Sequence, residues 1–278
     1  MIFVRHPLAA RQKPAPGERL AQPIAGGFWL PGMQACVPDA AGCNAPATII
    51  GGVTRVQGPF GGPALKFDNS SGYVDCALNG NNAFNWSTGV PIKRSFWAWV
   101  RRPTSSSVGP VFAKGNNTPN SGWNLSITTT GMTVGWIGAS NGQVLTTNIL
   151  SAGDWHHVMV AWDGVSGGSP LALGSMSIYL NGQPQTGTGS WPGVGQNSTD
   201  SFNLWIGHSA YVGSGGGAVS AYADLEIDHW GFDHRVYSQE EANDLYLRPF
   251  RNFTPAPYFR RSLAGGSVVA RPRIFVCT

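Results

Sequence analysis

Alternation of apolar and polar residues is the main pattern in the middle of the chain, clearest at residues 95–100 and 155–162. A period of two residues is typical of β-strands, because successive side chains point to opposite faces of a sheet. Such runs recur with little helix between them, which favours an antiparallel sandwich of two sheets. We predict strands near residues 64–68, 73–77, 92–101, 110–114, 123–128, 132–137, 144–149, 155–163, 176–181, 203–207 and 221–233.

Two local signals add a turn and a helix to this pattern. Asn181 and Gly182 predict a hairpin turn, because both residue types accept a positive φ. Ser238 and Glu241 have the spacing of a capping box, and the helix that follows is expected to reach Leu247, before Pro249. We therefore expect an all-β fold with one short C-terminal helix.

The composition fits one domain with extended arms. The 278 residues include 38 Gly and 20 Pro, and 11% are aromatic, which describes a loop-rich β protein with room for one large sandwich. We expect an extended N-terminal arm at residues 1–19, a domain at 20–247 and a basic, Pro- and Arg-rich C-terminal arm at 248–278.

Charge is divided unevenly between the arms and the domain. Residues 64–247 carry 7 Lys or Arg against 12 Asp or Glu, a charge of −5, whereas the flanks carry 11 against 2, a charge of +9. We expect the arms to dock on an acidic protein surface, and we do not expect nucleic acid as the partner. The alternative is that they are solvated tails. The residues predicted to make this assembly contact are Ile2, Phe3, Val4, Arg260, Arg261, Arg271, Arg273, Ile274 and Phe275.

Neither a membrane span nor an export signal is apparent. No apolar stretch approaches the roughly 18 residues of a membrane helix, and the first residues lack an apolar signal core. We therefore expect no membrane insertion. The four cysteines are scattered, so we expect reduced thiols, although Cys36 and Cys43 are close enough in sequence to close a small loop.

Eight segments follow one another in a recognisable order: Gly62–Asp68, Gly72–Asp75, Ser95–Val100, Gly153–Val158, Ser177–Gly182, Leu204–Gly207, Leu225–Trp230 and Ser238–Glu241. Their order resembles laminin-G-like and pentraxin-like domains of the concanavalin A-like lectin/glucanase superfamily, over about residues 20–247. The resemblance implies a two-sheet jelly roll.

The flanks contain an entry segment at residues 20–27 and a short Pro/Arg-rich tail after the last helix. These features are similar to the flanks of laminin-G-like proteins encoded among bacteriophage structural genes. This resemblance implies a virion protein assembled in the bacterial cytoplasm, with other virion proteins and further copies of the chain as partners.

Three alternating carboxylates, Asp224, Glu226 and Asp228, form the most enzyme-like motif. Retaining glycosidases of the laminarinase type, in the same superfamily, use an alternating trio with two carboxyl groups roughly 5–5.5 Å apart. In those enzymes the trio lies mid-chain, whereas the resemblance places these residues on the last strand before the terminal helix. We therefore expect a protein that is not an enzyme.

A calcium ion is the one cofactor considered. Asp68 and Asp228 match positions that bind calcium in some relatives, and hard oxygen ligands suit that ion. The alternative is that both carboxylates accept hydrogen bonds from turns. His156 and His157 are adjacent on a strand, so they point to opposite faces and cannot chelate one metal; we expect one to be packed and the other solvated.

Aromatic residues near predicted loops are candidates for stacking on sugars, and the same residues have core packing as their alternative role. The glycan-binding candidates are Trp86, Trp123, Trp191 and Tyr211.

Three functions remain open from the sequence. The first is a virion structural protein, either a capsid decoration protein or a fibre or spike subunit, whose jelly roll also binds host-surface glycans. The second is a carbohydrate-binding adhesin or secreted glycan-binding module. The third is a glycoside hydrolase.

Overall fold

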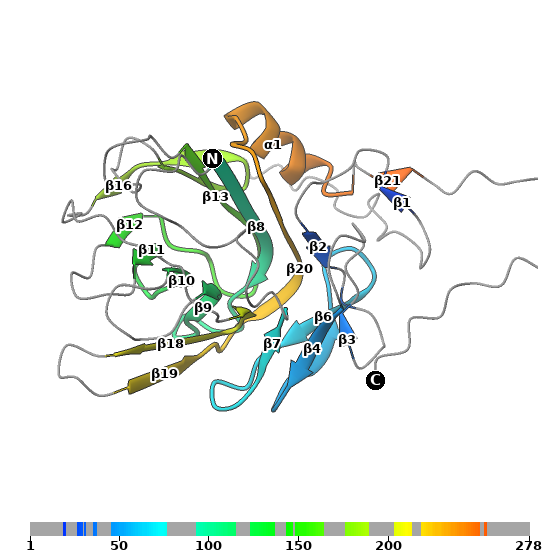
Figure 1. Ribbon diagram of the computed structural model, residues 1–278, viewed down its shortest axis with the longest axis vertical. Coiled ribbons are helices and arrows are strands. Elements are labelled where there is room, and N and C mark those ends of the chain that lie inside the picture. The colour runs from blue at the N-terminus through cyan, green and yellow to red at the C-terminus, as the bar shows by residue number, and fades with distance from the viewer. Residues whose placement is uncertain are drawn as a thin grey trace, which may run out of the picture.

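Two antiparallel sheets face each other across one core in the computed structural model (Figure 1). The prediction of an all-β jelly-roll sandwich is confirmed. The structure describes residues 19–20, 27–29, 31, 36–37, 46–76, 93–114, 123–136, 143–146, 148–163, 176–188, 203–212, 218–250 and 253–254.

The first sheet has nine strands among the described residues. Their spatial order is β16 (Gly187–Thr188), β12 (Gln143–Thr146), β11 (Met132–Trp136), β10 (Trp123–Ile127), β9 (Gly109–Lys114), β17 (Leu204–Ile206), β7 (Tyr73–Asp75), β4 (Ala47–Ile50) and β3 (Cys36–Val37).

The second sheet has eight strands in the same part of the chain. Seven follow the order β15 (Gln183–Gln185), β14 (Met176–Leu180), β13 (Trp155–Asp163), β8 (Lys93–Arg101), β20 (Glu226–Asp233), β6 (Pro63–Lys66) and β5 (Thr54–Gln57), and β2 (Gly27–Trp29) pairs with β20. A separate hairpin is formed by β18 (His208–Val212) and β19 (Ala218–Tyr222).

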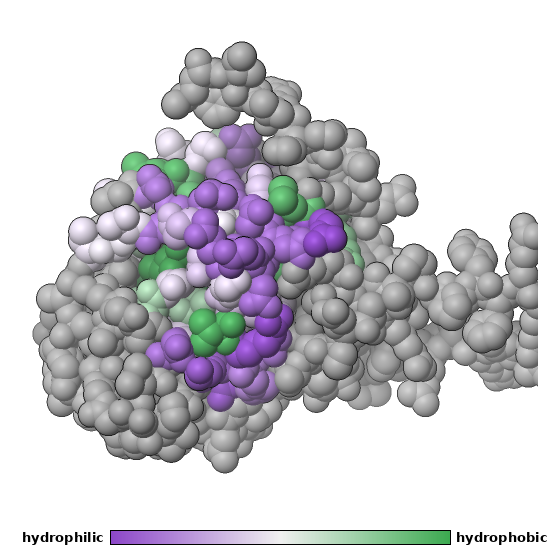
Figure 2. Space-filling model, turned by 90° about the horizontal axis from the view of Figure 1, so that it is seen from above, coloured by the Kyte–Doolittle hydropathy of each residue, from purple (hydrophilic) through white to green (hydrophobic). Residues whose placement is uncertain are grey.

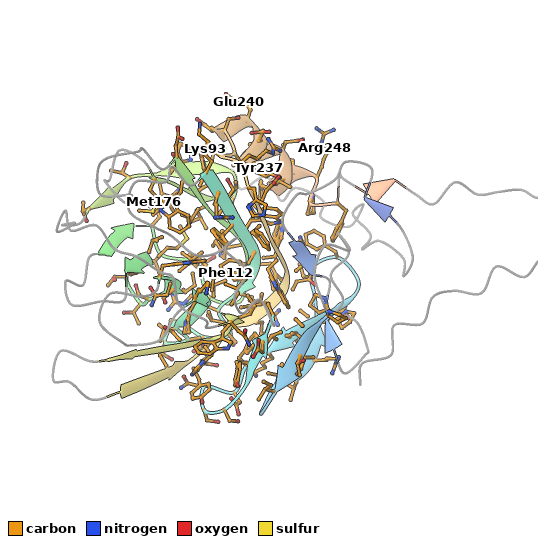
Figure 3. All side chains as sticks on the ribbon, viewed as in Figure 1. Lys93, Phe112, Met176, Tyr237, Glu240 and Arg248 are labelled. Atoms are coloured by element: carbon orange, nitrogen blue, oxygen red, sulfur yellow. The ribbon has the colours of Figure 1, made fainter. Side chains whose placement is uncertain are left out.

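The core between the sheets is built by alternate residues of the long strands. On β8, Phe96, Ala98 and Val100 are buried against the facing sheet, and Phe112 of β9 lies opposite them in the interior (Figure 3). Phe96 and Phe112 have ring centroids 6.0 Å apart. The strands predicted at residues 92–101 and 155–163 are therefore confirmed, and both faces of each strand are buried.

The outer face of the eight-stranded sheet is also covered, by helix α1 (Gln239–Leu247). Trp97 of β8 stacks on Tyr237, which lies beneath the helix in Figure 3, with centroids 5.5 Å apart. The predicted capping box is present, because Ser238 Oγ accepts from the Glu241 N–H and the Glu241 carboxylate accepts from the Ser238 N–H. Seen from above, on the side of α1, the described residues present a mainly hydrophilic surface (Figure 2).

One bulge interrupts the pairing of β20 with β8. Ile227 pairs with Val100 and Trp230 pairs with Ala98, so β20 contains one residue more than its partner between these points. Because of this extra residue, Ile227 and Trp230 both reach the core although they are three positions apart.

The predicted strand at residues 221–233 is divided in two. β19 ends at Tyr222 and β20 begins at Glu226. Between them the Ala223 N–H donates to the Gly207 carbonyl and the Asp224 N–H to the Val108 carbonyl, so the backbone leaves one sheet to join another. The predicted hairpin turn is confirmed, with φ of 52° at Asn181 and 75° at Gly182.

The inner ends of the two arms meet each other. β1 (Arg19–Leu20) pairs antiparallel with β21 (Phe253–Thr254). Phe250, which the sequence placed in the C-terminal arm, packs on Phe60 and His229 with ring centroids 5.2 and 4.9 Å away. The domain therefore extends at least to Phe250. The assembly residues predicted in both arms lie outside the described residues.

No helix in the described part of the chain is long and apolar enough to cross a membrane. Of the cysteines, Cys76 is a buried free thiol. Cys43 and Cys277 lie outside the described residues, and only the backbone of Cys36 is described.

Candidate functional site

The carboxylates of the enzyme-like motif each have a partner or a tight enclosure inside the fold. Asp224, which precedes β20, accepts a hydrogen bond from Ser107 Oγ at 2.7 Å. Glu226 forms an ion pair with Arg101, and the two side chains are 5% and 29% exposed. The Arg101 guanidinium in turn lies 5.2 Å from the ring centroid of Trp155. Glu226 is therefore paired with a cation that itself packs against an aromatic ring.

Asp228 is fully buried at the bulge of β20. One of its carboxylate oxygens lies 3.5 Å from His229 Nδ1. A Cβ added to Gly58 would lie 3.3 Å from Asp228 Cγ, so the loop backbone closes directly over this carboxylate. A substrate has no access to a carboxylate in this position.

The two predicted calcium ligands do not share a site. Pairing of Glu226 with Lys66 and of Ile227 with Leu65 places Asp228 level with Ala64. Asp68 is thus four residues along the sheet from Asp228, roughly 13 Å. The prediction that Asp68 and Asp228 bind one calcium ion together is therefore wrong. The sequence did not reveal the antiparallel register that separates them.

Asp68 instead closes the turn after β6. Its carboxylate accepts from the N–H groups of Ser70, Ser71 and Gly72, at 3.0, 2.9 and 2.7 Å, and from the Ser70 and Ser71 hydroxyls. The Ser71 N–H bond and then the Ser70 hydroxyl bond lower the Asp68 pKa. Within the described residues, no group of three or more His, Cys, Asp or Glu could hold a metal ion. Calcium as a cofactor stays a prediction.

Both histidines of the predicted pair are buried, which corrects the expectation that one is solvated. His156 lies at the rim of the core, with Nε2 3.0 Å from Ser151 Oγ and Nδ1 accepting from Asn181 Nδ2 at 3.1 Å. His157 points the other way, onto the face that α1 covers, and is 1% exposed. The sequence missed that both faces of β13 are covered.

The predicted glycan-binding aromatics are distributed differently from the expectation. Trp123 is 1% exposed, with its ring centroid 4.5 Å from Phe96 and 5.5 Å from Trp162 in the core. It cannot stack on a sugar, so this candidate was wrong. Trp86 and Trp191 lie outside the described residues, and of Tyr211 only the backbone, in β18, is described, so these three stay predictions.

The structure brings together four aromatic side chains that the sequence did not single out. Tyr73 of β7, Trp205 of β17 and Tyr222 of β19 are half-buried and surround His208 of β18. The His208 ring centroid lies 5.0 Å from Tyr73, 5.0 Å from Trp205 and 4.5 Å from Tyr222. We call these four residues the aromatic cup.

Polar groups border the aromatic cup on the nine-stranded sheet. Asp75 pairs with Trp205 across the strands on one side and with Thr48 on the other. Asn203 Nδ2 donates to the Asp75 carboxylate at 2.8 Å. Burial, then the nearby Asp75 charge, raises the pKa of Tyr73, and burial lowers the pKa of His208.

Alternation along β7 could have predicted from the sequence that Tyr73 and Asp75 point to the outer face. Val74 points into the core, so Tyr73 and Asp75 point to the outer face, and Trp205 does the same between the core residues Leu204 and Ile206. Sequence reasoning missed these residues because it looked for aromatics near loops.

A sequence profile described as the concanavalin A-like lectin/glucanases superfamily matches residues 68–242. No curated protein sequence matches the chain. Among solved structures, domain 4 of AbnA, a GH43 extracellular arabinanase from Geobacillus stearothermophilus in complex with arabinotriose, is 14% identical. Its TM-score is 0.56, over 82% of this chain and 98% of that domain.

Two further structures are similar over most of this chain. The binding domain of botulinum neurotoxin serotype D/C is 16% identical with a TM-score of 0.55, over 80% of this chain and 52% of that domain. A Trypanosoma rangeli sialidase in complex with the inhibitor DANA is 16% identical with a TM-score of 0.51, over 83% and 34%. The chain spans about half of the toxin domain and a third of the sialidase. At these identities the likeness shows the fold alone.

Proposed function

Because the chain belongs to the concanavalin A-like lectin/glucanase superfamily, we propose that it is a non-catalytic, lectin-like module that binds glycans. The observation that carries the proposal is the burial and pairing of the carboxylates in the enzyme-like motif. Glu226 is paired with Arg101, and Asp228 is fully buried at the bulge. Glycoside hydrolysis needs two carboxyl groups that flank the bond to be cleaved. Glu226 and Asp228 are both buried within the protein and cannot flank a bound substrate.

Hydrolysis and binding assays on the same protein test this proposal. We expect no release of reducing sugar from β-glucan, arabinan or sialylated oligosaccharides, and retention of at least one glycan on an array. The array is run with calcium and with chelator, because calcium binding is the open cofactor prediction. Hydrolysis that disappears in Glu226→Gln would overturn the proposal.

We further propose that the module is part of a bacteriophage virion, as a capsid decoration protein or a fibre or spike subunit assembled in the bacterial cytoplasm. Two observations support attachment through the arms to other virion proteins and to further copies of the chain. The flanks carry +9 against −5 at residues 64–247. The β1–β21 pair places the inner ends of both arms side by side (Figure 1).

Deletion of the arms tests the virion proposal. Removal of residues 1–18 and 255–278 keeps the β1–β21 pair and Phe250, so the domain should stay folded but fail to assemble on particles or into its oligomer. The longer deletion of residues 1–19 and 249–278 also removes Phe250, and it should lower the melting temperature as well. Undiminished assembly of the shorter protein at physiological salt would show that the arms are solvated tails.

A further inference from the structure

The aromatic cup combines ring surfaces with hydrogen-bonding groups on an outer face of the sandwich. Tyr73, Trp205 and Tyr222 come from three different strands and remain half-buried around His208. Asp75 and Asn203 lie beside them. This mixture differs from that of a protein-docking patch, which has a larger apolar core.

We propose that the aromatic cup is the glycan-binding site of this chain and that it takes a neutral sugar ring. The site deepens the proposed function and rests on it. The C–H face of the sugar would pack against the Tyr and Trp rings, while its hydroxyl groups donate to the Asp75 carboxylate and exchange hydrogen bonds with the Thr48 hydroxyl at the border.

The charges of the cup select a neutral ligand over an acidic one. Asp75, at the border of the aromatic cup, is acidic and would repel a uronic or sialic acid. His208 is 7% exposed, and burial lowers its pKa, so the imidazole supplies no compensating positive charge at neutral pH. A neutral hexose or pentose meets no such repulsion.

His208 forms the floor of the cup as a positioning residue. Its two ring nitrogens are buried and make no hydrogen bond in the described structure, so the ring is held by its three aromatic neighbours. An imidazole that makes no hydrogen bond contributes by its shape, because it packs against all three rings.

The backbone builds this arrangement at Gly207. Gly207 has a φ of 78°, and a Cβ there would lie 2.4 Å from the Phe67 ring. The left-handed conformation turns the chain from β17 into β18, so that Trp205 and His208, three positions apart, enter the same cup. The close approach of the Gly207 backbone to Phe67 places the cup directly against the core.

Affinity electrophoresis provides the test, with dextran, mannan, galactan and arabinan as neutral probes and polygalacturonate as the acidic probe. We expect a neutral polysaccharide to retard the wild type more strongly than polygalacturonate does. Trp205→Ala, Tyr73→Ala and Tyr222→Ala should each weaken that retention by about tenfold or more. Trp205→Phe should recover part of it.

Trp155→Ala is the matched control, since Trp155 is also half-buried but lies on β13 of the other sheet. It should bind as the wild type does. Folding is checked for each variant by its melting transition, and if Trp205→Ala does not fold, the Tyr73→Ala and Tyr222→Ala variants decide. A glycan that is bound equally by all folded variants overturns the site and leaves the proposed function intact. A wild type that retains no glycan overturns both.

Discussion

Two histidines on opposite sides of the sandwich have similar aromatic neighbours and different surroundings. His157 lies 5.6 Å from Trp99 and 6.5 Å from Tyr246 of α1, measured between ring centroids, and it is 1% exposed. His208 lies among Tyr73, Trp205 and Tyr222, whose rings are half-buried. The chain covers the first cluster with its own helix.

This comparison separates aromatic residues that stabilise the fold from those available to a ligand. Burial, with the neighbouring His229, lowers the pKa of His157 to about 3. Around His208 the chain leaves part of three rings exposed to water, and in the proposed complex a sugar replaces that water. Residue type alone does not separate the two kinds of aromatic residue. The difference is that α1 covers one cluster, whereas the rings around His208 stay half-buried.

Replacement of one tryptophan in each cluster should give the largest contrast. Trp97, stacked on Tyr237 under α1, is 1% exposed, so Trp97→Ala should lower the free energy of unfolding by about 3–5 kcal/mol. Trp205→Ala should cost only about 1 kcal/mol, since its ring is half-buried. Urea unfolding measures both. Equal losses of unfolding free energy would mean that Trp205 supports the fold as much as Trp97 does.

Acid should lower the free energy of unfolding through His157, which lies beneath α1. His157 stays neutral in the folded protein down to a pKa of about 3, whereas the unfolded chain takes up the proton near 6.5. Its contribution is therefore complete above about pH 6.5 and falls, as the pH is lowered towards 3, by up to about 1.4 kcal/mol per pH unit.

Unfolding in urea between pH 7 and 4 measures this slope. His157→Gln should make it shallower, whatever it does to stability at pH 7. His208→Gln should have a smaller effect on the slope, because His208 is less buried. Parallel curves for wild type and His157→Gln would contradict the assignment.

Adding one methyl group at Gly207, in the turn between β17 and β18, should lower the stability of the protein. Gly207→Ala places a side chain at positive φ and against Phe67, and should lower stability by about 1–3 kcal/mol. Gly61→Ala is the control, because Gly61 has a φ of 81° but no atom within 4 Å of the added Cβ. A larger loss at Gly207 than at Gly61, by thermal unfolding, measures the Phe67 contact.

The smallest effect is expected at the start of α1. Ser238→Ala removes the acceptor for the Glu241 N–H and should cost about 1 kcal/mol. Ser238→Asp should restore most of it, because aspartate also accepts at this position. Glycan retention should not change in either variant, since α1 covers the other sheet. Loss of retention in Ser238→Ala would show that the two sides are coupled.

Strong local patterns accounted for most of the fold. Residues 93–101 and 155–163 form the long central strands, and Ser238 caps the helix, as the sequence predicted. The break between β19 and β20 was missed because it depends on carbonyls of Gly207 and Val108, far away in the sequence. Alternation cannot reveal a partner of this kind.

The site was much less predictable than the fold. The aromatic cup joins residues from Tyr73 to Tyr222 through strand pairing, and no spacing in the sequence brings them together. Trp123 was misplaced because it was assigned by its position next to a predicted loop, whereas it is the first residue of β10 and packs against Phe96 and Trp162 in the core. Asp68 and Asp228 were paired without the register that separates them.

The bulge of β20 also bears on how this strand tolerates insertion and deletion. Elsewhere in a strand, loss of one residue turns every later side chain to the opposite face. At Asp228 and His229, loss of one residue would restore simple alternation, with Ile227 and Trp230 still facing inward against Val100 and Ala98. Descendants of this sequence can therefore vary in length at this point of a central strand and keep the same core.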